Sequence, residues 1–264
     1  MRIEIELDKG VDRNASKYFE KAKKLRKKIT GLKKAVEEAK KRKDVASEKA
    51  QENKLKKEAK EKEDSRKKEW YEKFRWFISS DGFLVIGGKD ATSNEIVIKK
   101  HTLTTEYVYH TEAPGSPFFV IKNPDGKEIP DKTREEAAIA SATFSKAWNS
   151  GIKALEVYEV LGSQVTKEAK AGEYIAKGAF MVYGKRKYYD SIVSLAIGVF
   201  GEKKVVMSGP ESAIVANCSQ FTILRQGYLK KGEIAKKIMH KLKIHSNELI
   251  LGLLPAGKFD LKTK

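Results

Sequence analysis

Residues 73–123 decide the fold of this chain, and they read KFRWFISSDGFLVIGGKDATSNEIVIKKHTLTTEYVYHTEAPGSPFFVIKN. Short apolar runs rich in aromatic and β-branched residues are separated here by glycine and polar turns, which is the pattern of short β-strands. We predict strands over residues 83–86, 107–109 and 118–121. Residues 94–101 are predicted to form a helix between the first two of these strands.

The downstream residues continue this alternation of strands and helices. Residues 133–149 are predicted to form a helix with Thr133 as its N-cap and with Glu135 and Glu136 in its first turn. Further strands are predicted over residues 155–161, 179–183, 192–200, 205–206 and 221–224, and further helices over residues 211–216 and 230–242. Strands and helices in this irregular order predict an α+β fold, with helices packed on a mixed sheet.

A heptad pattern precedes the strands. Seven residues recur at alternating four- and three-residue steps: Tyr18, Ala22, Leu25, Ile29, Leu32, Val36 and Ala39. This spacing indicates a coiled-coil helix. A second apolar pattern follows the charged residues 40–44 and comprises Val45, Ala46, Ala50, Leu55 and Ala59. We predict two helices paired as a long antiparallel hairpin, with pairing between two copies of the chain as the open alternative.

The positive charge of the chain is concentrated in this helical region. The formal net charge is +18, and 25 lysines and arginines against 12 acidic residues lie between Arg13 and Trp76. A basic stripe of this kind attracts polyanions by releasing their counterions, so nucleic acid is the expected class of partner. A solvated helical face is the alternative explanation.

Length and composition exclude several other classes of protein and of binding site. A chain of 264 residues with 40% hydrophobic content can bury one good core and carry an appendage. The single cysteine, Cys218, excludes an intramolecular disulfide and a multi-cysteine zinc site. No apolar run approaches the length that spans a bilayer, and the first residues do not resemble a signal peptide. We expect a soluble cytoplasmic protein that contacts no membrane.

Several blocks in order resemble one family. They are Phe74-Arg75-Trp76-Phe77, Ser80-Asp81-Gly82, Val85-Ile86-Gly87-Gly88-Lys89-Asp90, Asn94-Glu95, Val120-Ile121-Lys122-Asn123, Ser145-Lys146-Ala147-Trp148, Gly172-Glu173-Tyr174 and Gly178-Ala179-Phe180-Met181. Together they resemble the R domain of the NFACT family of ribosome-associated quality-control factors. Asn14-Ala15 and Tyr18-Phe19 resemble the family's lead-in to its coiled coil, so the resemblance covers roughly the first three-quarters of the chain. Lys89 is a departure, since an arginine is common there.

The resemblance implies an RNA-binding module that engages a stalled large ribosomal subunit. Residues 1–76 are then the coiled-coil hairpin with its lead-in, residues 77–190 the R-like RNA-binding domain, and residues 191–264 an α+β extension packed on it. The N-terminal domain and the helix-hairpin-helix elements of full-length members are not recognised, so we expect a fragment or a reduced member.

The candidate site begins in residues 81–94. Glycines at positions 82, 87 and 88 permit close backbone approach, while Asp81, Lys89, Asp90 and Asn94 offer donors and acceptors. The Gly-Lys-Ser/Thr spacing of a P-loop is absent. Asp81-Gly82 also suits a tight hairpin turn, which does not exclude RNA binding.

The remaining candidate residues are one histidine and a set of basic side chains. His110 lies at a strand end, where it either binds a nucleotide or is a satisfied structural histidine. The predicted phosphate contacts are Lys122, Lys167, Lys170, Lys185, Arg186 and Lys187, with Tyr174, Tyr183, Tyr188 or Tyr189 available to stack on unpaired bases.

We therefore predict a non-enzymatic RNA-binding module that contacts rRNA or tRNA through the R-like domain and a protein or ribosomal partner through the coiled coil. No catalytic residue, metal or cofactor is expected. Two rivals remain: a protein-interaction or adhesion module, and a metal-dependent nuclease using Asp81, Asp90 and Glu95.

Overall fold

The computed structural model describes residues 4–8, 10–64, 67–113, 115–168 and 175–262, with residues 41–64 described by their backbone alone. It consists of two units, Met1–Arg66 and Lys67–Lys264. Lys170 and Tyr174, which the sequence suggested as RNA contacts, lie outside the described residues.

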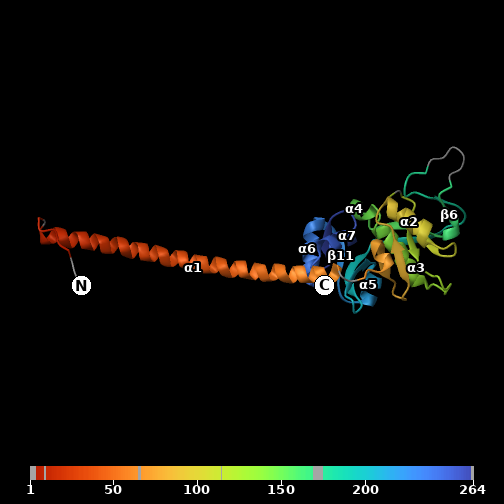
Figure 1. Ribbon diagram of the computed structural model, residues 1–264. Coiled ribbons are helices and arrows are strands. Elements are labelled where there is room, and N and C mark those ends of the chain that lie inside the picture. Colours follow the sequence, from red (N-terminus) through yellow and green to blue (C-terminus); the bar gives the residue numbers. More distant parts are fainter. Residues whose placement is uncertain (1–3, 9, 65–66, 114, 169–174, 263–264) are drawn as a thin grey trace. The chain divides into compact units, whose positions relative to one another are not determined.

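The first unit is built on one uninterrupted helix, α1 (Val11–Asp64) (Figure 1). This corrects the predicted hairpin, in which the chain turns near residues 40–44. The physical reason lies in residues 40–50, which contain neither glycine nor proline and are mostly lysine, alanine, glutamate and arginine, all strong helix formers. Nothing in that stretch ends a helix. The heptad residues Leu25, Ile29, Leu32 and Val36 are each more than half exposed along α1.

The chain before α1 folds back onto the start of the helix through Asn14. The Asn14 Nδ2 donates to the Glu6 carbonyl over 3.0 Å, and the Glu6 amide donates to Asn14 Oδ1 over 2.9 Å. Lys17 pairs with the Glu6 carboxylate, and the Tyr18 hydroxyl donates to the carbonyl of Glu4. These reciprocal bonds explain why Asn14 is buried near an otherwise exposed helix terminus.

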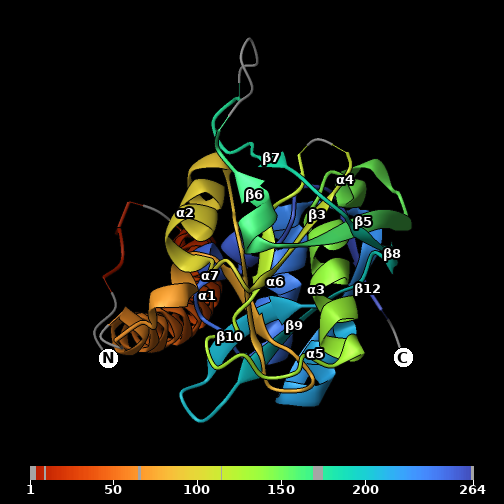
Figure 2. The same ribbon diagram turned by 90° about the vertical axis from the view of Figure 1, so that its right-hand side faces the viewer.

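The second unit contains a six-stranded sheet in the order β1-β2-β4-β3-β5-β8. Its strands are β1 (Arg75–Ile78), β2 (Leu84–Gly87), β3 (Tyr107–Thr111), β4 (Phe119–Ile121), β5 (Ala154–Leu161) and β8 (Lys187–Ile192). The 3-10 turn η1 (Trp70–Lys73) leads into β1, and α2 (Ala91–His101) links β2 to β3. Helix α3 (Asp131–Thr143) packs on this sheet against β3, β4, β5 and β8, and α4 (Ala147–Ser150) follows it (Figure 2).

A second sheet of four strands has the order β10-β9-β11-β12. Its strands are β9 (Leu195–Phe200), β10 (Val205–Gly209), β11 (Cys218–Leu229) and β12 (Phe259–Leu261). Helices α5 (Glu211–Asn217), α6 (Lys231–Leu242) and α7 (Asn247–Leu253) belong to this half. A small ribbon of β6 (Val165–Thr166) and β7 (Met181–Val182), preceded by the 3-10 turn η2 (Gly162–Gln164), completes the unit.

The two sheets share one hydrophobic core. Phe77 of β1 packs so closely on β10 that a Cβ added to Gly209 would lie 2.9 Å from its ring. The Ile78 amide also donates to the Met207 Sδ over 3.2 Å. Buried Glu136 of α3 joins the same region, because its carboxylate accepts from the Ser80 amide over 2.8 Å and from the Ser212 hydroxyl over 2.7 Å. The division that the sequence suggested after residue 190 therefore lies within one continuous hydrophobic core.

The predicted α+β class is confirmed. Every strand pair in the described residues is antiparallel, so the sheets are not mixed in strand direction. Short connections such as residues 79–83 between β1 and β2 return the chain directly beside itself, which forces antiparallel pairing. Helix α3 begins earlier than predicted, with Pro130 rather than Thr133 at its N-cap.

Removing residues 1–66 is expected to leave a cooperatively folded unit whose melting temperature lies within about 3 °C of that of the whole chain. The core begins only at Phe74, and the last residues before it pack within the second unit, where Trp70 stacks on His101 with 4.6 Å between ring centroids. Circular dichroism should also record a large loss of helicity. A matched truncation to residue 79, which removes β1, should instead abolish cooperative unfolding.

Replacing Gly87 with alanine is expected to lower the free energy of unfolding by about 1–3 kcal/mol. Gly87 does not adopt a positive φ, but its Cβ would lie 2.6 Å from Cε1 of Phe119, which is fully buried. Gly232→Ala is the matched control, because a Cβ there meets no atom within 4 Å and the residue lies in helix α6. Urea denaturation should show this control to be neutral or slightly stabilising.

Candidate nucleic-acid interface

A pocket of about 410 Å³ opens on the six-stranded sheet beside the start of α2. Four of the sequence-predicted residues line it: Lys89, Asp90, Asn94 and His110. Its other lining residues include Arg75 of β1, Phe118, Tyr158 of β5, and residues 177–180. Segments far apart in sequence therefore meet here. From the sequence, only lining residues between positions 89 and 110 were candidates for the site.

Asn94 holds the back of this pocket together. Its Oδ1 accepts a hydrogen bond from the Phe118 amide over 3.2 Å, and the Gly88 amide donates to the Phe118 carbonyl over 3.2 Å. A Cβ added to Gly88 would lie 1.9 Å from Asn94 Oδ1. Glycine is therefore required at position 88 for the close approach of β2 to α2, as the sequence suggested for this turn.

Asp90 caps helix α2 and organises the loop before it. The Asp90 Oδ1 accepts from the Ser93 amide over 2.8 Å, and Ser93 Oγ accepts from the amides of Lys89 and Asp90, each over 2.8 Å. The hydrogen bond from the Ser93 amide lowers the pKa of Asp90. The carboxylate thus remains ionised and structural, with one edge at the pocket rim.

Lys89 faces the pocket with no carboxylate held against its ammonium group in the described part of the chain. Its Nζ donates to the Glu72 carbonyl over 3.4 Å. Burial lowers the pKa of Lys89, and the nearby Arg75 guanidinium lowers it further. Positive charges thus lie close together at this end of the pocket.

His110 is packed rather than free. Its ring stacks on Phe118 with centroids 4.2 Å apart, and Nδ1 lies 2.6 Å from the Thr111 carbonyl and 3.3 Å from the Tyr158 hydroxyl. Burial lowers the pKa of His110, so the imidazole is neutral at pH 7. A carbonyl oxygen only accepts, so the short contact requires the proton on Nδ1. This geometry suits a structural histidine that shapes the pocket wall.

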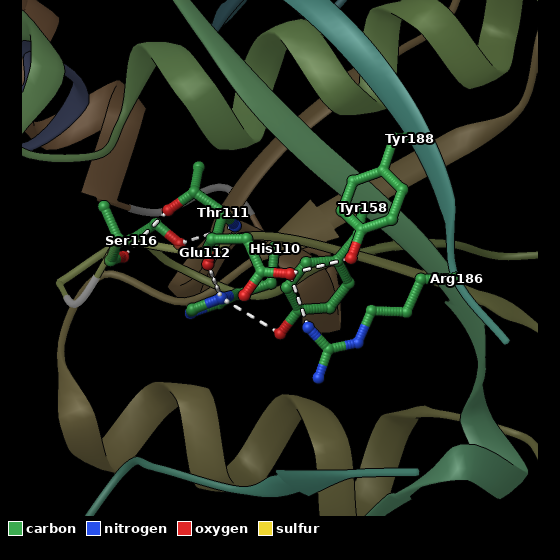
Figure 3. Close-up of polar contacts among 8 residues, drawn as sticks. His110, Thr111, Glu112, Ser116, Tyr158, Arg186 and Tyr188 are labelled. Atoms are coloured by element: carbon green, nitrogen blue, oxygen red, sulfur yellow. Dashed lines mark hydrogen bonds and ion pairs between the residues drawn. The ribbon is translucent and has the colours of Figure 1, made fainter. Parts of the chain in front are cut away.

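Arg186, which directly precedes strand β8, contacts the residues of the same pocket wall (Figure 3). It pairs with the Glu112 carboxylate, which also accepts from the Tyr188 hydroxyl over 3.0 Å. The Arg186 guanidinium lies 4.6 Å from the ring centroid of Tyr158. Partial burial opposes ionisation of Glu112, but the hydrogen bonds from Arg186 and Tyr188 outweigh it and lower the pKa of Glu112. Only part of the Arg186 charge is therefore available to a ligand.

Lys122 and Lys167 have internal partners. Lys122 Nζ lies 2.6 Å from both Glu106 Oε2 and the His101 carbonyl, and the Glu106 side chain is fully buried. Lys167 Nζ donates to Glu95 Oε1 over 2.8 Å and to the carbonyls of Ala176 and Ala179. Neither lines the pocket. Their predicted contact with phosphate stays a prediction, and these partners weaken it.

Asp81 lies in the turn between β1 and β2, where Gly82 has a φ of +87°. Its Oδ2 accepts from the Thr133 hydroxyl over 2.7 Å, and the Thr133 oxygen in turn accepts from the Ser79 hydroxyl over 2.9 Å. Asp81 is not among the residues that line the pocket. The tight-turn interpretation of Asp81-Gly82 describes this geometry well.

Lys185 and Lys187 remain exposed at the start of strand β8, and Lys187 Nζ lies 4.9 Å from the Tyr189 ring centroid. The three carboxylates considered for a nuclease metal make separate contacts, Asp81 with Thr133, Asp90 with Ser93, and Glu95 with Lys167. Among the described residues no three potential ligands cluster as a metal site. Nor does any helix there have the length and apolarity to cross a membrane.

Sequence reasoning missed Arg75, Tyr158 and Lys177 as lining residues of the pocket. Arg75 offered one signal, since it is a charged residue between the buried aromatics Phe74 and Trp76. Tyr158 and Lys177 offered none, because only the long-range pairing of β5 and the return of residues 177–180 bring them to α2.

Residues 73–184 match the family model described as the NFACT protein RNA binding domain. The Archaeal Rqc2 homolog aRqcH of Methanocaldococcus jannaschii is 37% identical over 72% of this chain and 29% of its own length. The Ribosome quality control complex subunit NEMF homolog of Drosophila melanogaster is 42% identical over 45% of this chain and 12% of its own. A solved structure, the C-terminal of the fibronectin/fibrinogen-binding protein from Streptococcus suis, is 21% identical over 45% of each chain with a TM-score of 0.38, too low to carry an argument.

Proposed function

This chain belongs to the NFACT family through the RNA-binding domain at residues 73–184, and on that premise we propose that it is an RNA-binding module of ribosome-associated quality control. It contacts rRNA or tRNA on the large ribosomal subunit through the second unit. Helix α1 reaches a protein or ribosomal partner. The module performs no catalysis and works in the cytoplasm.

One observation carries this proposal. Within the matched domain, Arg75, Lys89 and Lys177 line a single pocket together with the aromatic side chains Phe118 and Tyr158. Cations bind the phosphate backbone, and aromatic surfaces suit bases that are not paired. The large positive charge of the whole chain favours the same class of ligand.

The chain spans about a third or less of the length of the curated relatives it matches. The activity of those larger proteins is therefore not transferred to it. We expect the chain by itself to bind RNA without directing the addition of residues to a nascent peptide.

A gel-shift assay with labelled tRNA and magnesium at low salt separates this function from its rivals. Intact, shifted tRNA is the result that we expect. Cleaved tRNA would favour a metal-dependent nuclease, and the absence of any shift would favour a protein-interaction module. A tRNA sample with magnesium but without the protein controls for spontaneous cleavage.

A further inference from the structure

Arg75 is a half-buried cation without a matching anion in the described part of the chain. Its Nη1 atom is buried and has no hydrogen-bond partner, and its guanidinium lies over the Phe144 ring, 4.2 Å from the centroid. Arg75 appears in none of the ion pairs among the described residues. An unpaired buried charge is destabilising, so a fold retains one only where something offsets it.

Lysines lie near Arg75, and Asp90 is the one carboxylate among the described residues that line the same pocket. Burial lowers the pKa of Arg75 to about 10. Burial, and then the Arg75 charge itself, lowers the pKa of both Lys89 and Lys231. Lys177 lies on the rim of the same pocket. Because the Arg75 charge lowers the pKa of two neighbouring lysines, an anion bound beside Arg75 would be favoured.

Resting on the proposed RNA-binding function, we propose that this pocket holds one unpaired nucleotide, with its phosphate against the Arg75 guanidinium and its base against the aromatic wall. The planar fork of arginine matches two phosphate oxygens, and an already desolvated guanidinium gains most from that pairing. Lys89 and Lys177 supply further charge at the mouth of the pocket.

The size and the walls of the pocket select a single nucleotide over a duplex. A volume of about 410 Å³ is that of a small-ligand pocket, which a base-paired helix cannot enter. His110, Phe118, Tyr158 and Phe180 provide the apolar wall for a base. RNA-binding proteins commonly read unstacked bases in this manner, whereas duplexes are bound over their outer surface.

The first test measures single-stranded RNA binding by the full chain. A fluorescein-labelled 12-nucleotide RNA is titrated with the wild type, Arg75→Met and Arg225→Met, and binding is followed by anisotropy. Arg225→Met is the matched control, because Arg225 is exposed on β11 and its replacement removes the same charge. Arg75→Met should weaken binding about 10- to 100-fold, the range for lost hydrogen bonds to a charged group. The control should change binding by no more than about twofold.

Thermal unfolding of the same variants separates binding from structure. Because methionine removes a half-buried, unpaired charge and keeps the packing on Phe144, Arg75→Met should melt at the wild-type temperature or above it. Unchanged RNA affinity in a folded Arg75→Met would overturn the proposal. Should that variant not fold, Arg75→Lys decides: it keeps the charge but loses the fork, and wild-type affinity in it would equally refute the site.

The second test uses AMP and adenosine, followed through the amide NMR signals of Gly88, Ala91 and Gly178. AMP should shift these signals saturably in the wild type and not in Arg75→Met, while adenosine, which lacks the phosphate, should not shift them. AMP binding without any RNA binding would remove the RNA-module proposal and leave the pocket. RNA binding that ignores Arg75, with no AMP shifts, would remove the pocket alone.

Discussion

Lys122→Ala is expected to lower the free energy of unfolding by about 3–5 kcal/mol, because it leaves a buried carboxylate without its cation. The Glu106 side chain is fully buried, and its oxygens also accept from the amides of Leu103 and Asn123 over 2.8 and 2.9 Å. Lys122 itself is 15% exposed. Urea denaturation measures the loss of unfolding free energy. Under conditions in which Lys122→Ala is folded, it should bind RNA as the wild type does.

Lys127→Ala is the matched control for Lys122. Lys127 pairs with Asp125 over 3.1 Å, but the two side chains are 68% and 65% exposed. Such a pair contributes little, so the control should change stability by less than about 1 kcal/mol. If Lys122→Ala were equally mild and weakened RNA binding tenfold or more, Lys122 would have to face RNA, and its assignment as an internal cation would be wrong.

The second large effect is expected from replacing Lys185, Arg186 and Lys187 together with alanine. Log affinity for single-stranded RNA changes by about −0.7 per log unit of salt for each phosphate neutralised, so three lost contacts should flatten the slope by about two units. Between 50 and 200 mM salt the affinity of the wild type should then fall more than tenfold further than that of the variant. Anisotropy titrations at four salt concentrations measure both slopes.

A triple replacement of Lys236, Lys237 and Lys241 removes the same charge from the exposed face of helix α6 and controls for diffuse electrostatics. It should leave the slope almost unchanged. Equal flattening in both triple variants, with both folded by circular dichroism, would move the phosphate contacts from the start of β8 to the surface as a whole.

Local patterns in the sequence predicted most strands and helices of the second unit. The alternation of apolar residues with glycine turns in residues 73–123 marks β2, β3 and β4 within one or two residues. Helix ends were predicted less well. Thr133 is a residue type that favours the N-cap position, yet it lies within helix α3, where its hydroxyl hydrogen-bonds to Asp81 and Ser79. Tertiary hydrogen bonds, which no local window records, decided that position.

The candidate site divides along the same line. Lys89, Asp90 and Asn94 line one pocket, and all three lie in the glycine-rich segment that the sequence marked as the candidate site. His110 joins them from strand β3, and the sequence did not predict that convergence. The internal partners of Lys122 and Lys167 could not be predicted, because Glu106 and Glu95 reach them only through the folded sheet. The role of Arg75 was missed for a related reason: the sequence shows a charged residue between two aromatic ones, but only the fold shows that its Nη1 atom has no hydrogen-bond partner. The continuous helix α1 was missed because a change of heptad pattern was read as a turn.

The most direct test of the account is the salt dependence of RNA binding by the full chain. The dissociation constant for labelled single-stranded RNA is measured from 50 to 200 mM salt, in parallel for the whole chain and for residues 67–264. The account predicts binding by both, with a slope of about −3 or steeper in log affinity against log salt, as four or more neutralised phosphates require. Absence of binding at 50 mM, or a slope near zero, would contradict it.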